Sequence, residues 1–304
     1  MTLLVLGGIN EDVVVHVEAL PRPGETVMSR GIDRAVGGKG LNKAVAAARF
    51  GGDVCLLGAI GDDPAGAMLR NVLQQAGVDD RHLIVDPRAP SGQAFITLAE
   101  DGENCIVVNA GANAGIAAPD IARQPITAHV YLAEFEAPVA AVHALFATPA
   151  SQAGIRILNA APALPEGRAT LALADIVILN ETELEAYCAG HPTAAEADIV
   201  AAARMLIDGG ERRIVVTLGA AGCLLVEADR YRRFMPHEVK AIDTIGAGDC
   251  FCGVFAAALA EGMEIAAAIE QANAAAAISV GRRGAAAASP IRAEITGFLE
   301  RESA

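Results

Sequence analysis

A repeating order of strand and helix runs through the second half of the chain, and it constrains the fold more than any other feature. Four short apolar runs, each followed by a helical stretch, lie at 130–133, 155–158, 176–179 and 214–217. A strand that helices bury on both faces reads as a continuous run of Val, Ile and Leu, and such strands form parallel sheets. The pattern therefore predicts an α/β fold with a doubly wound, mostly parallel sheet flanked by helices.

The first half of the chain adds a second, smaller sheet to this prediction. Extended segments are expected at 13–17, 26–36, 93–98 and 105–108, the last two forming a hairpin. These segments predict a small β-sheet lid made by about 11–36 and 91–109. The chain contains no Pro-rich or Ser-rich linker, so we expect one domain spanning 1–304.

The remaining elements complete the layered pattern. Further strands are expected at 3–6, 54–57, 224–227 and 231–234, the last two as an antiparallel pair. Helices are expected at 39–50, 65–75, 248–261 and 264–280.

Composition narrows the class of protein and its partners. The chain of 304 residues is 53% hydrophobic and 4% aromatic, which suits a core of small aliphatic side chains. A formal charge of -14 without clusters of Lys and Arg argues against binding to nucleic acid or to an anionic membrane. No apolar segment is long enough to span a membrane or to act as a signal peptide. Six scattered cysteines without metal-ligand spacing fit buried thiols in a cytoplasmic protein.

The strongest chemical signal is the glycine turn Gly246-Ala247-Gly248-Asp249, which precedes an apolar helix. Glycines allow a tight turn, and the first N–H groups of a helix attract negative charge. A carboxylate at that point can accept the proton of an attacking alcohol during phosphoryl transfer. Taken alone, the pattern also fits an Asp that caps a helix.

Other polar residues stand where ligands bind in α/β folds, but no standard nucleotide motif is present. Asn10 and Asp12 follow the carboxyl end of the first predicted strand. The segment around Lys39 has glycine where a P-loop has Ser or Thr, and 246–251 does not fit the dinucleotide-binding pattern. The chain also lacks the catalytic-loop motif of protein kinases.

Taken together, the motifs resemble those of the ribokinase family of carbohydrate kinases. The segment 37–44 resembles the N-terminal signature of that family, and 243–251 resembles its C-terminal signature. Family blocks occur in the expected order at 7–12, 134–138, 180–183 and 217–219. The resemblance therefore extends along the whole chain and implies the ribokinase-like fold.

The resemblance implies a role for each matched residue. Asp249 would be the general base, and the N–H groups of Gly246, Ala247 and Gly248 would form an anion hole. The residues that would bind sugar hydroxyls are Asn10, Asp12, Gly38, Lys39, Asn42, Glu136 and Asp249. Those implied for the nucleotide are Asn180, Glu183, Thr217, Gly219 and Asn273, the first two also orienting Mg²⁺ through water. Those implied for a potassium ion are Asp243, Ile245, Ser279, Arg282, Gly284 and Ser289.

Local pattern alone leaves plainer interpretations open. Glu136 could be a solvated loop acid, and Asn180 with Glu183 could be a helix capping box. Ser289 stands one residue later than the usual family spacing.

The implied activity is ATP-dependent phosphorylation of the primary hydroxyl of a neutral sugar, D-ribose to D-ribose 5-phosphate. A carboxylate at Glu136 would repel a sugar that already carries a phosphate. Nucleoside kinases, other sugar kinases and a non-catalytic sugar-binding regulator are the alternatives. Exposed edges of the lid would favour a homodimer.

Overall fold

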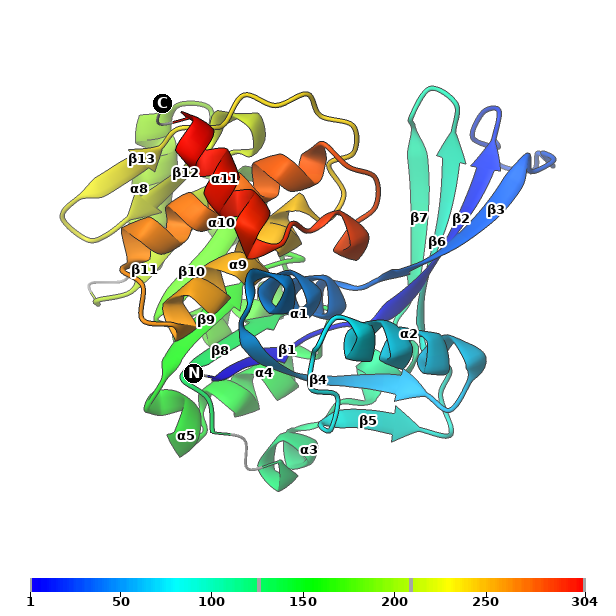
Figure 1. Cartoon of the computed structure of the whole chain (residues 1–304), viewed down its shortest axis with the longest axis horizontal. Coiled ribbons are helices and arrows are strands. Elements are labelled where there is room, and N and C mark those ends of the chain that lie inside the picture. The colour runs from blue at the N-terminus through cyan, green and yellow to red at the C-terminus, as the bar shows by residue number, and fades with distance from the viewer. Residues whose placement is uncertain (1, 125–126, 208–209, 303–304) are drawn as a thin grey trace.

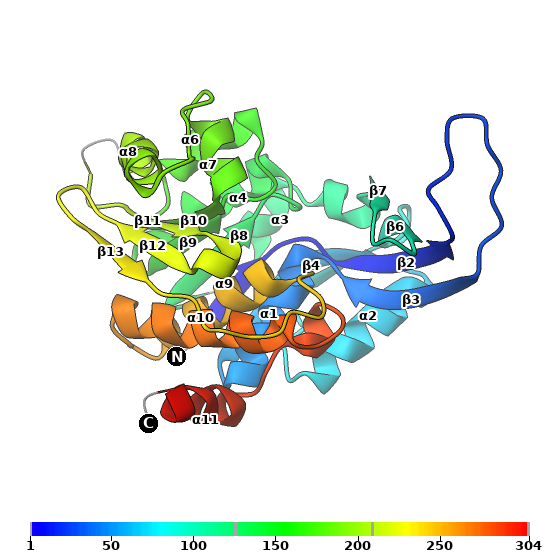
Figure 2. The same ribbon diagram turned by 90° about the horizontal axis from the view of Figure 1, so that it is seen from above.

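The computed structural model describes residues 2–124, 127–207 and 210–302. A large sheet with helices on both faces forms the body, and a smaller sheet projects from one side of it (Figure 1). The turned view in Figure 2 shows the helical layers above and below the large sheet.

The large sheet has the order β13-β12-β11-β10-β9-β8-β1-β4-β5. Its strands are β1 (Thr2–Leu6), β4 (Asp53–Gly61), β5 (Leu83–Asp86), β8 (Val130–Glu134), β9 (Ile155–Asn159), β10 (Ile176–Asn180), β11 (Arg213–Thr217), β12 (Cys223–Val226) and β13 (Tyr231–Phe234). All neighbours pair in parallel except β11 with β12 and β12 with β13. The predicted doubly wound, mostly parallel sheet is confirmed. The short strand β5 was missed.

The strand order reverses at β1, and this places the functional end of the molecule. From β1 the chain first adds β4 on one side and later adds β8 on the other. Loops that leave the carboxyl ends of such strands diverge and open a crevice, where ligands of open α/β sheets bind. Residues 7–9 and 135–138 both leave the sheet at this point.

Helices cover each face of the large sheet because alternate strand residues point to opposite sides. Leu3 and Val5 pack with α1 (Lys39–Phe50), α2 (Pro64–Gln75), α9 (Ala247–Ala260), α10 (Ile265–Val280) and α11 (Arg292–Glu302). Leu4 and Leu6 pack with α3 (Ala118–Arg123), α4 (Val139–Phe146), α6 (Arg168–Leu171), α7 (Glu181–Tyr187) and α8 (Glu196–Ile207). The short α5 (Pro149–Gln152) lies at the foot of β9. Four 3₁₀ turns in the described residues are η1 (Gly111–Gly115), η2 (Pro165–Gly167), η3 (Gly219–Ala221) and η4 (Ala286–Ala288).

Helices α1 and α9 approach each other closely, and glycines permit this contact. A Cβ added at Gly253 of α9 would lie 2.3 Å from the backbone oxygen of Lys43 in α1. A Cβ at Gly40 would lie 2.5 Å from the carbonyl carbon of Gly7 after β1. Contacts this short exclude any larger residue without a backbone shift. Segments far apart in the sequence are thereby brought together at the carboxyl end of β1.

The small sheet has the order β3-β2-β6-β7. Its strands are β2 (Asn10–Val17), β3 (Gly31–Gly37), β6 (Gly92–Ala99) and β7 (Asn104–Asn109), so the predicted hairpin is confirmed. The segment expected to be extended from residue 26 joins the sheet only at Gly31. Residues 18–30 instead form the long loop that projects from the sheet in Figure 2.

Candidate active site

Helix α9 begins with the predicted glycine turn. Gly246 adopts a left-handed φ of 75°, which favours glycine, and its N–H group has no acceptor within the described residues. The N–H of Gly248 is likewise unpaired within that part of the chain, whereas the N–H of Ala247 donates to the carbonyl of Thr244 at 3.3 Å. The turn therefore presents unpaired N–H groups at the positive end of a helix, as an anion hole requires.

Asp249 lies in the first turn of α9, but it does not cap the helix. Its carboxylate turns to α1, where Oδ1 accepts a hydrogen bond from Lys43 Nζ at 2.5 Å and Oδ2 accepts one from Asn42 Nδ2 at 2.9 Å. The N-cap is Gly246, and no side chain caps the helix there. The plainer interpretation of Asp249 as a helix cap is therefore wrong for this structure.

The electrostatic surroundings keep Asp249 ionised. Burial alone would raise the pKa of its carboxyl, but the charges of Lys43 and Lys39 and the hydrogen bonds from Lys43 and Asn42 outweigh burial and lower it. Burial alone would also lower the pKa of Lys43, and the charge of Asp249 raises it instead. The two groups form an ion pair, Lys43 with a wholly buried side chain and Asp249 with a nearly buried one.

Lys43 was not among the residues predicted for the site. It lies on the buried face of α1, four residues after Lys39, where an apolar side chain is the usual occupant. A lysine on the apolar stripe of a helix is the signal that could have identified it, because a lysine is almost never fully buried without a partner.

A second group of polar residues lies around Glu136, just after β8. Glu136 Oε2 accepts hydrogen bonds from the backbone N–H of Lys39 at 2.9 Å and from Asn10 Nδ2 at 3.3 Å. Gly38 permits the turn before α1 to pack closely on the segment after β1, because a Cβ there would lie 2.6 Å from the carbonyl oxygen of Gly8. Glu136 is thus joined to two other predicted sugar ligands, and it is not an isolated loop acid. We call Asn10, Asp12, Gly38, Lys39 and Glu136 the sugar cluster.

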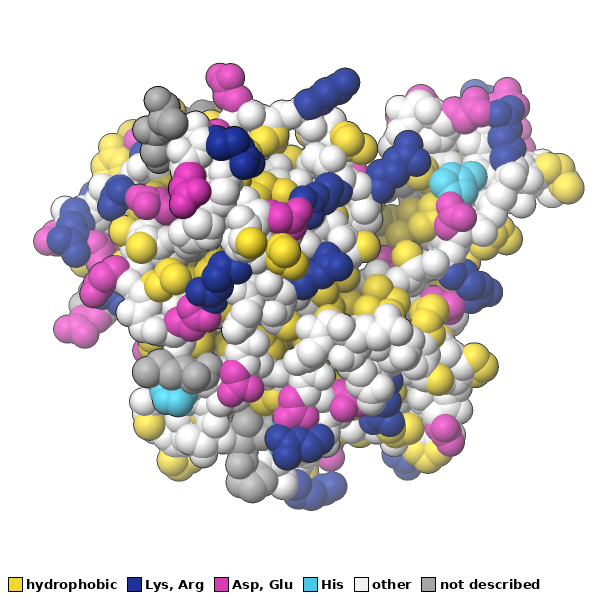
Figure 3. Space-filling view, in the orientation of Figure 1, with side chains coloured by type: hydrophobic (Ala, Val, Ile, Leu, Met, Phe, Trp, Pro, Cys, Tyr) yellow, Lys and Arg dark blue, Asp and Glu magenta, His cyan; other side chains and the backbone are white. Residues whose placement is uncertain are grey.

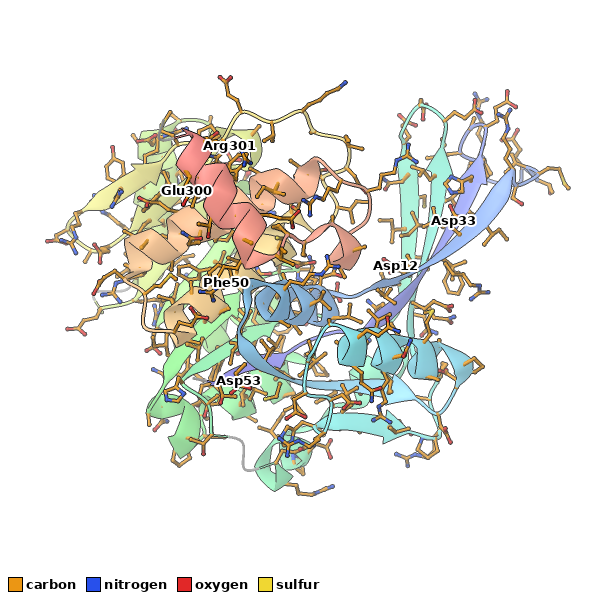
Figure 4. The ribbon with its side chains drawn as sticks, in the orientation of Figure 1. Asp12, Asp33, Phe50, Asp53, Glu300 and Arg301 are labelled. Carbon is orange, nitrogen blue, oxygen red and sulfur yellow. The ribbon has the colours of Figure 1, made fainter. Side chains whose placement is uncertain are left out.

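Asp12 stands beside this network on β2, near the root of the small sheet in Figure 4. Burial, with a smaller contribution from the negative charge of Glu136, raises the pKa of its carboxyl to about 6. Within the described residues its oxygens have no hydrogen-bond donor. Both oxygens are therefore available to accept from hydroxyl groups of a ligand.

Asn113 and Glu134 support the sugar cluster from behind, and neither was predicted. Asn113 Nδ2 donates to the side-chain oxygen of Asn10 and to the backbone oxygen of Ile9, each at 2.9 Å. The buried Glu134 accepts from the backbone N–H groups of Gly8 and Glu136. Burial, with the charge of Glu136, raises the pKa of Glu134 to about 8.

A pocket of about 220 Å³ lies on the other side of Asp249. Its lining residues are Lys39, Asn159, Ala161, Ile178, Leu179, Asn180, Glu183, Thr217, Gly246, Gly248, Asp249 and Cys252, and we call it the phosphate pocket. Three strand ends, β9, β10 and β11, meet the start of α9 here. Lys39 belongs to the sugar cluster and also lines this pocket, and its charge acts on Asp249, which lines the pocket too. Both residues therefore lie at the junction of the cluster and the pocket.

The predicted nucleotide residues fall into two groups. Asn180 and Glu183 line the phosphate pocket and also form a capping box at α7, with reciprocal hydrogen bonds of 2.8 and 2.9 Å. The interpretation of Asn180 and Glu183 as a helix capping box is therefore correct as well. Thr217 lines the pocket, whereas Gly219 and Asn273 do not. Asn273 Nδ2 donates to the backbone oxygen of Met235 at 2.7 Å and so fixes the loop after β13.

The residues predicted to hold potassium gather around Asp243. Its carboxylate accepts from the N–H of Ile245 at 3.0 Å and from the N–H of Gly284 at 2.9 Å, which ties two loops together. The buried Ser279 and Ser289 lie beside the buried thiol of Cys250, whose pKa burial raises to about 12. The Arg282 side chain forms an ion pair with Glu294.

The space-filling view shows a hollow between the small sheet and the body, with apolar side chains in its depth (Figure 3). The sugar cluster lies where the small sheet meets the body, because β2 and the turn before α1 both start there. None of the helices in the described part of the chain combines the length and the apolarity that a bilayer crossing requires.

The whole chain resembles known carbohydrate kinases. The model of the pfkB family of carbohydrate kinases matches residues 1–292. The chain belongs to this family. It is 39% identical to the ribokinase of Haemophilus influenzae, with 98% of each chain covered.

Solved structures of family members have the same fold. A ribokinase from Thermotoga maritima superposes with a TM-score of 0.90 at 32% identity, covering 98% of this chain and 99% of the other. A ribokinase from Arabidopsis thaliana, solved with ribose and ATP, gives a TM-score of 0.89 at 28% identity, covering 98% of each chain. The ribokinase-like fold and the family expected from the motifs are confirmed.

Proposed function

We propose that this protein transfers the γ-phosphoryl group of ATP to the primary hydroxyl of D-ribose, giving D-ribose 5-phosphate and ADP. The observation that carries the proposal is the position of Asp249, a buried ionised carboxylate between the sugar cluster and the phosphate pocket. The similarity to ribokinases along the whole chain supports the same substrate.

The sugar cluster suits a neutral polyol. Asp12 and Glu136 supply carboxylate oxygens that can each accept from neighbouring hydroxyls, and Asn10 is held in a fixed orientation by Asn113. The buried Oδ1 of Asn42 has no hydrogen-bond partner within the described residues, and a sugar hydroxyl would satisfy it. Two carboxylates beside the sugar would repel a phosphorylated substrate.

In the proposed reaction Asp249 accepts the proton of the primary hydroxyl as the sugar oxygen forms its bond to the γ-phosphorus. The bond between that phosphorus and the bridging oxygen breaks, and ADP leaves with the electron pair. Charge on the transferred group would be stabilised by the N–H groups of Gly246 and Gly248 and by Lys39. The N–H of Ala247 can join the anion hole if its long bond to Thr244 opens.

The phosphate pocket fits a hydrated magnesium ion. Asn180 and Glu183 offer amide and carboxylate oxygens in this pocket. The described residues contain no group of three or more His, Cys, Asp or Glu that could hold a metal ion by itself. Mg²⁺ typically keeps several waters and binds through a few carboxylates and substrate phosphates. When bound, it supplies neutralisation of phosphate charge. We propose that Thr217, Gly219 and Asn273 lie along the rest of the nucleotide.

The two loops joined by Asp243 fit a potassium ion. Backbone carbonyls at Ile245, Arg282 and Gly284 would hold it, with hydroxyl oxygens of Ser279 or Ser289 nearby. Such an ion would add positive charge beside the anion hole.

We further propose one kinase domain of residues 1–304 whose small sheet acts as a lid over the sugar and takes part in a homodimer. Ile32, Phe95 and Val107 share the face of the sheet opposite Asp12, and they are 59%, 44% and 62% exposed. An exposed apolar face of this kind suits a partner surface, here a second copy of the chain. Use of ATP and six free thiols support a cytoplasmic location.

The lid also argues against a nucleoside as the substrate. On the face that carries Asp12 the neighbouring side chains are Ala94 and Val108, and the aromatic Phe95 points to the other face. A nucleoside base would find no aromatic ring to stack on there.

The test is ADP release with ribose, deoxyribose, fructose, adenosine and fructose 6-phosphate as acceptors. We expect the highest kcat/KM with ribose and none above background with fructose 6-phosphate. Preference for adenosine would favour a nucleoside kinase. Ribose binding by calorimetry without turnover on any acceptor would favour a sugar-binding regulator and refute the proposal.

A further inference from the structure

A buried lysine contacts the proposed base, and no step above uses it. Lys43 is fully buried, and its Nζ lies 2.5 Å from Oδ1 of Asp249. Asn42 holds the other carboxylate oxygen. Both oxygens of the base are therefore fixed by neighbouring residues of α1 in the absence of a sugar, and one of these two contacts carries a full positive charge.

We propose that Lys43 is a positioning residue for phosphoryl transfer, holding the Asp249 carboxylate in the orientation in which it meets the sugar hydroxyl. The inference rests on the proposed role of Asp249 as the base. A carboxylate tied at one oxygen by an ammonium group and at the other by an amide cannot rotate about its side-chain bonds. Its remaining lone pairs then have fixed directions, and reaction rate depends steeply on such alignment.

The surroundings of the pair explain why a charge is kept in this interior. Charged or titratable groups face the pair from four of the elements around it: Lys39 on α1, Cys252 on α9, Glu183 on α7 and Glu134 at the end of β8. Glu134 is a second wholly buried carboxyl whose pKa the charge of Lys43 lowers. Lys43 therefore interacts with acidic groups of both the phosphate side and the sugar side.

A role confined to folding is the competing explanation, because the removal of one partner from a buried ion pair destabilises a protein. The close contact of Gly253 with the backbone of Lys43 shows that the site is tightly packed. The test must therefore separate the rate of the chemical step from the stability of the fold and from sugar affinity.

The experiment uses the full chain with Lys43→Met, which removes the ammonium group, and Lys43→Gln, which keeps a hydrogen-bond donor without the charge. Single-turnover phosphorylation of ribose at saturating ATP and Mg²⁺ is measured from pH 5 to 9, with ribose affinity by calorimetry and melting by circular dichroism. Lys240→Met is the control, because Lys240 is an exposed lysine on the loop after β13.

We expect Lys43→Met to lower the single-turnover rate about 10- to 100-fold, while ribose affinity stays within about threefold of the parent. Because the charge of Lys43 lowers the pKa of Asp249, its loss shifts the acidic limb of the rate profile to higher pH. Lys43→Gln should recover part of the rate and keep the shifted limb. Lys240→Met should match the parent.

The inference is overturned if a folded Lys43→Met or Lys43→Gln protein has the rate and pH profile of the parent, or if rate and ribose affinity fall together without a shift in the limb. If Lys43→Met does not fold, Lys43→Gln, which keeps a hydrogen-bond donor beside the Asp249 carboxylate, decides alone. Asp249→Asn is run in parallel. Activity retained by Asp249→Asn refutes the proposed base, whereas an inactive Asp249→Asn with an unaffected Lys43→Gln refutes only the positioning role.

Discussion

Among single residues, Asp249 has the most specific environment in the molecule. Its carboxylate is buried and ionised. It accepts hydrogen bonds from Asn42 and Lys43 of α1, and Lys43 lies 206 positions away in the sequence. A group that must take a proton only in the transition state gains from being ionised beforehand.

Replacement of Asp249 by Asn should abolish the base without removing the shape of the site. We expect the turnover of Asp249→Asn to fall about 10²- to 10⁴-fold, the contribution typical of a general base, with ribose binding retained. Steady-state assays and calorimetry measure the two quantities. Asp53→Asn is a matched control at the amino end of β4, away from the carboxyl ends of the strands where the site lies (Figure 4), and it should keep full activity. Turnover near that of the parent in Asp249→Asn would contradict the assignment.

Asp12 should give sugar binding a pH dependence. The pKa of its carboxyl is raised to about 6, so it is protonated below that pH and then loses acceptor capacity for a sugar hydroxyl. Affinity for ribose should therefore be full above pH 7 and should weaken about tenfold per pH unit below the pKa. Calorimetry without nucleotide from pH 5 to 8 measures this dependence.

Two variants make the pH experiment specific. Asp12→Asn should bind ribose weakly with a flat profile, because the titrating group is gone. Asp33→Asn changes an exposed Asp farther out on the same face of the small sheet (Figure 4) and should leave the parent profile intact. An affinity for ribose that is constant over the whole range in the parent protein would show that Asp12 does not bind the sugar as the carboxylate.

Sequence reasoning predicted the residues of the candidate site that belong to motifs and missed the neighbours that are defined by burial. Gly246, Asp249 and Glu136 could be predicted because they lie in recognisable blocks. Lys43 and Asn113 could not, since their importance comes from partners that are remote in the sequence, 206 and 103 positions away. The position of Lys43 on the apolar stripe of α1 indicates burial, but no local pattern identifies the partner.

At the scale of elements, the contact between α1 and α9 decides whether the site exists. α1 supplies Asn42 and Lys43, and α9 supplies Asp249 and the glycine turn. The close approach depends on Gly253, where a Cβ would meet the backbone of Lys43. Backbone atoms cannot rotate away as a side chain can, so a larger residue would separate the helices.

Substitution of Gly253 by Ala should therefore destabilise the fold and lower activity together. We expect a loss of about 1–3 kcal/mol, the usual cost of overpacking, measured by urea denaturation, and a reduced turnover. Gly297→Ala is the control, because a Cβ there meets only the flexible end of Arg301 at 3.4 Å and Ala favours a helix. A Gly253→Ala protein as stable and active as the parent would show that the two helices tolerate a wider separation.

The elements themselves were largely predictable from the sequence. Buried parallel strands read as apolar runs, and α1 was expected at the residues where it occurs. β5 was missed because four residues with mixed burial give no clear pattern. The segment from residue 26 was expected to be extended, but the turn at Pro21 to Gly24 delays the return of the chain to the sheet. The order of the strands in the large sheet could not be predicted either, because it depends on how distant segments pack in the core.

For the whole molecule, the projecting small sheet is the surface that we propose for contact with a second copy of the chain. On its face opposite Asp12, the side chains of Ile32, Phe95 and Val107 are exposed, and an exposed apolar surface is a typical contact surface. The other face carries Asp12 and points toward the site. A partner on the first face would therefore also restrain the position of the second.

A charge on the exposed face should separate a dimer into monomers. We expect the parent protein to have the mass of a dimer by light scattering after size-exclusion chromatography, and Val107→Asp to have that of a monomer, because a buried unpaired charge opposes association. Met205→Asp changes an exposed Met on α8, away from the small sheet, and should remain dimeric. A parent protein that is monomeric at micromolar concentration would refute the proposed assembly.

Because Lys43 is buried between α1 and α9, its chemical reactivity can be used to measure how often these two helices separate. The sequence contains three lysines, Lys39, Lys43 and Lys240, of which Lys240 is exposed and Lys39 is half-buried. An amine-reactive reagent can modify Lys43 only when α1 and α9 move apart and the amine loses its proton. The labelling rate of this one side chain, read by mass spectrometry against Lys240, thus measures how often the catalytic helices separate, and ligands that close the site should slow it.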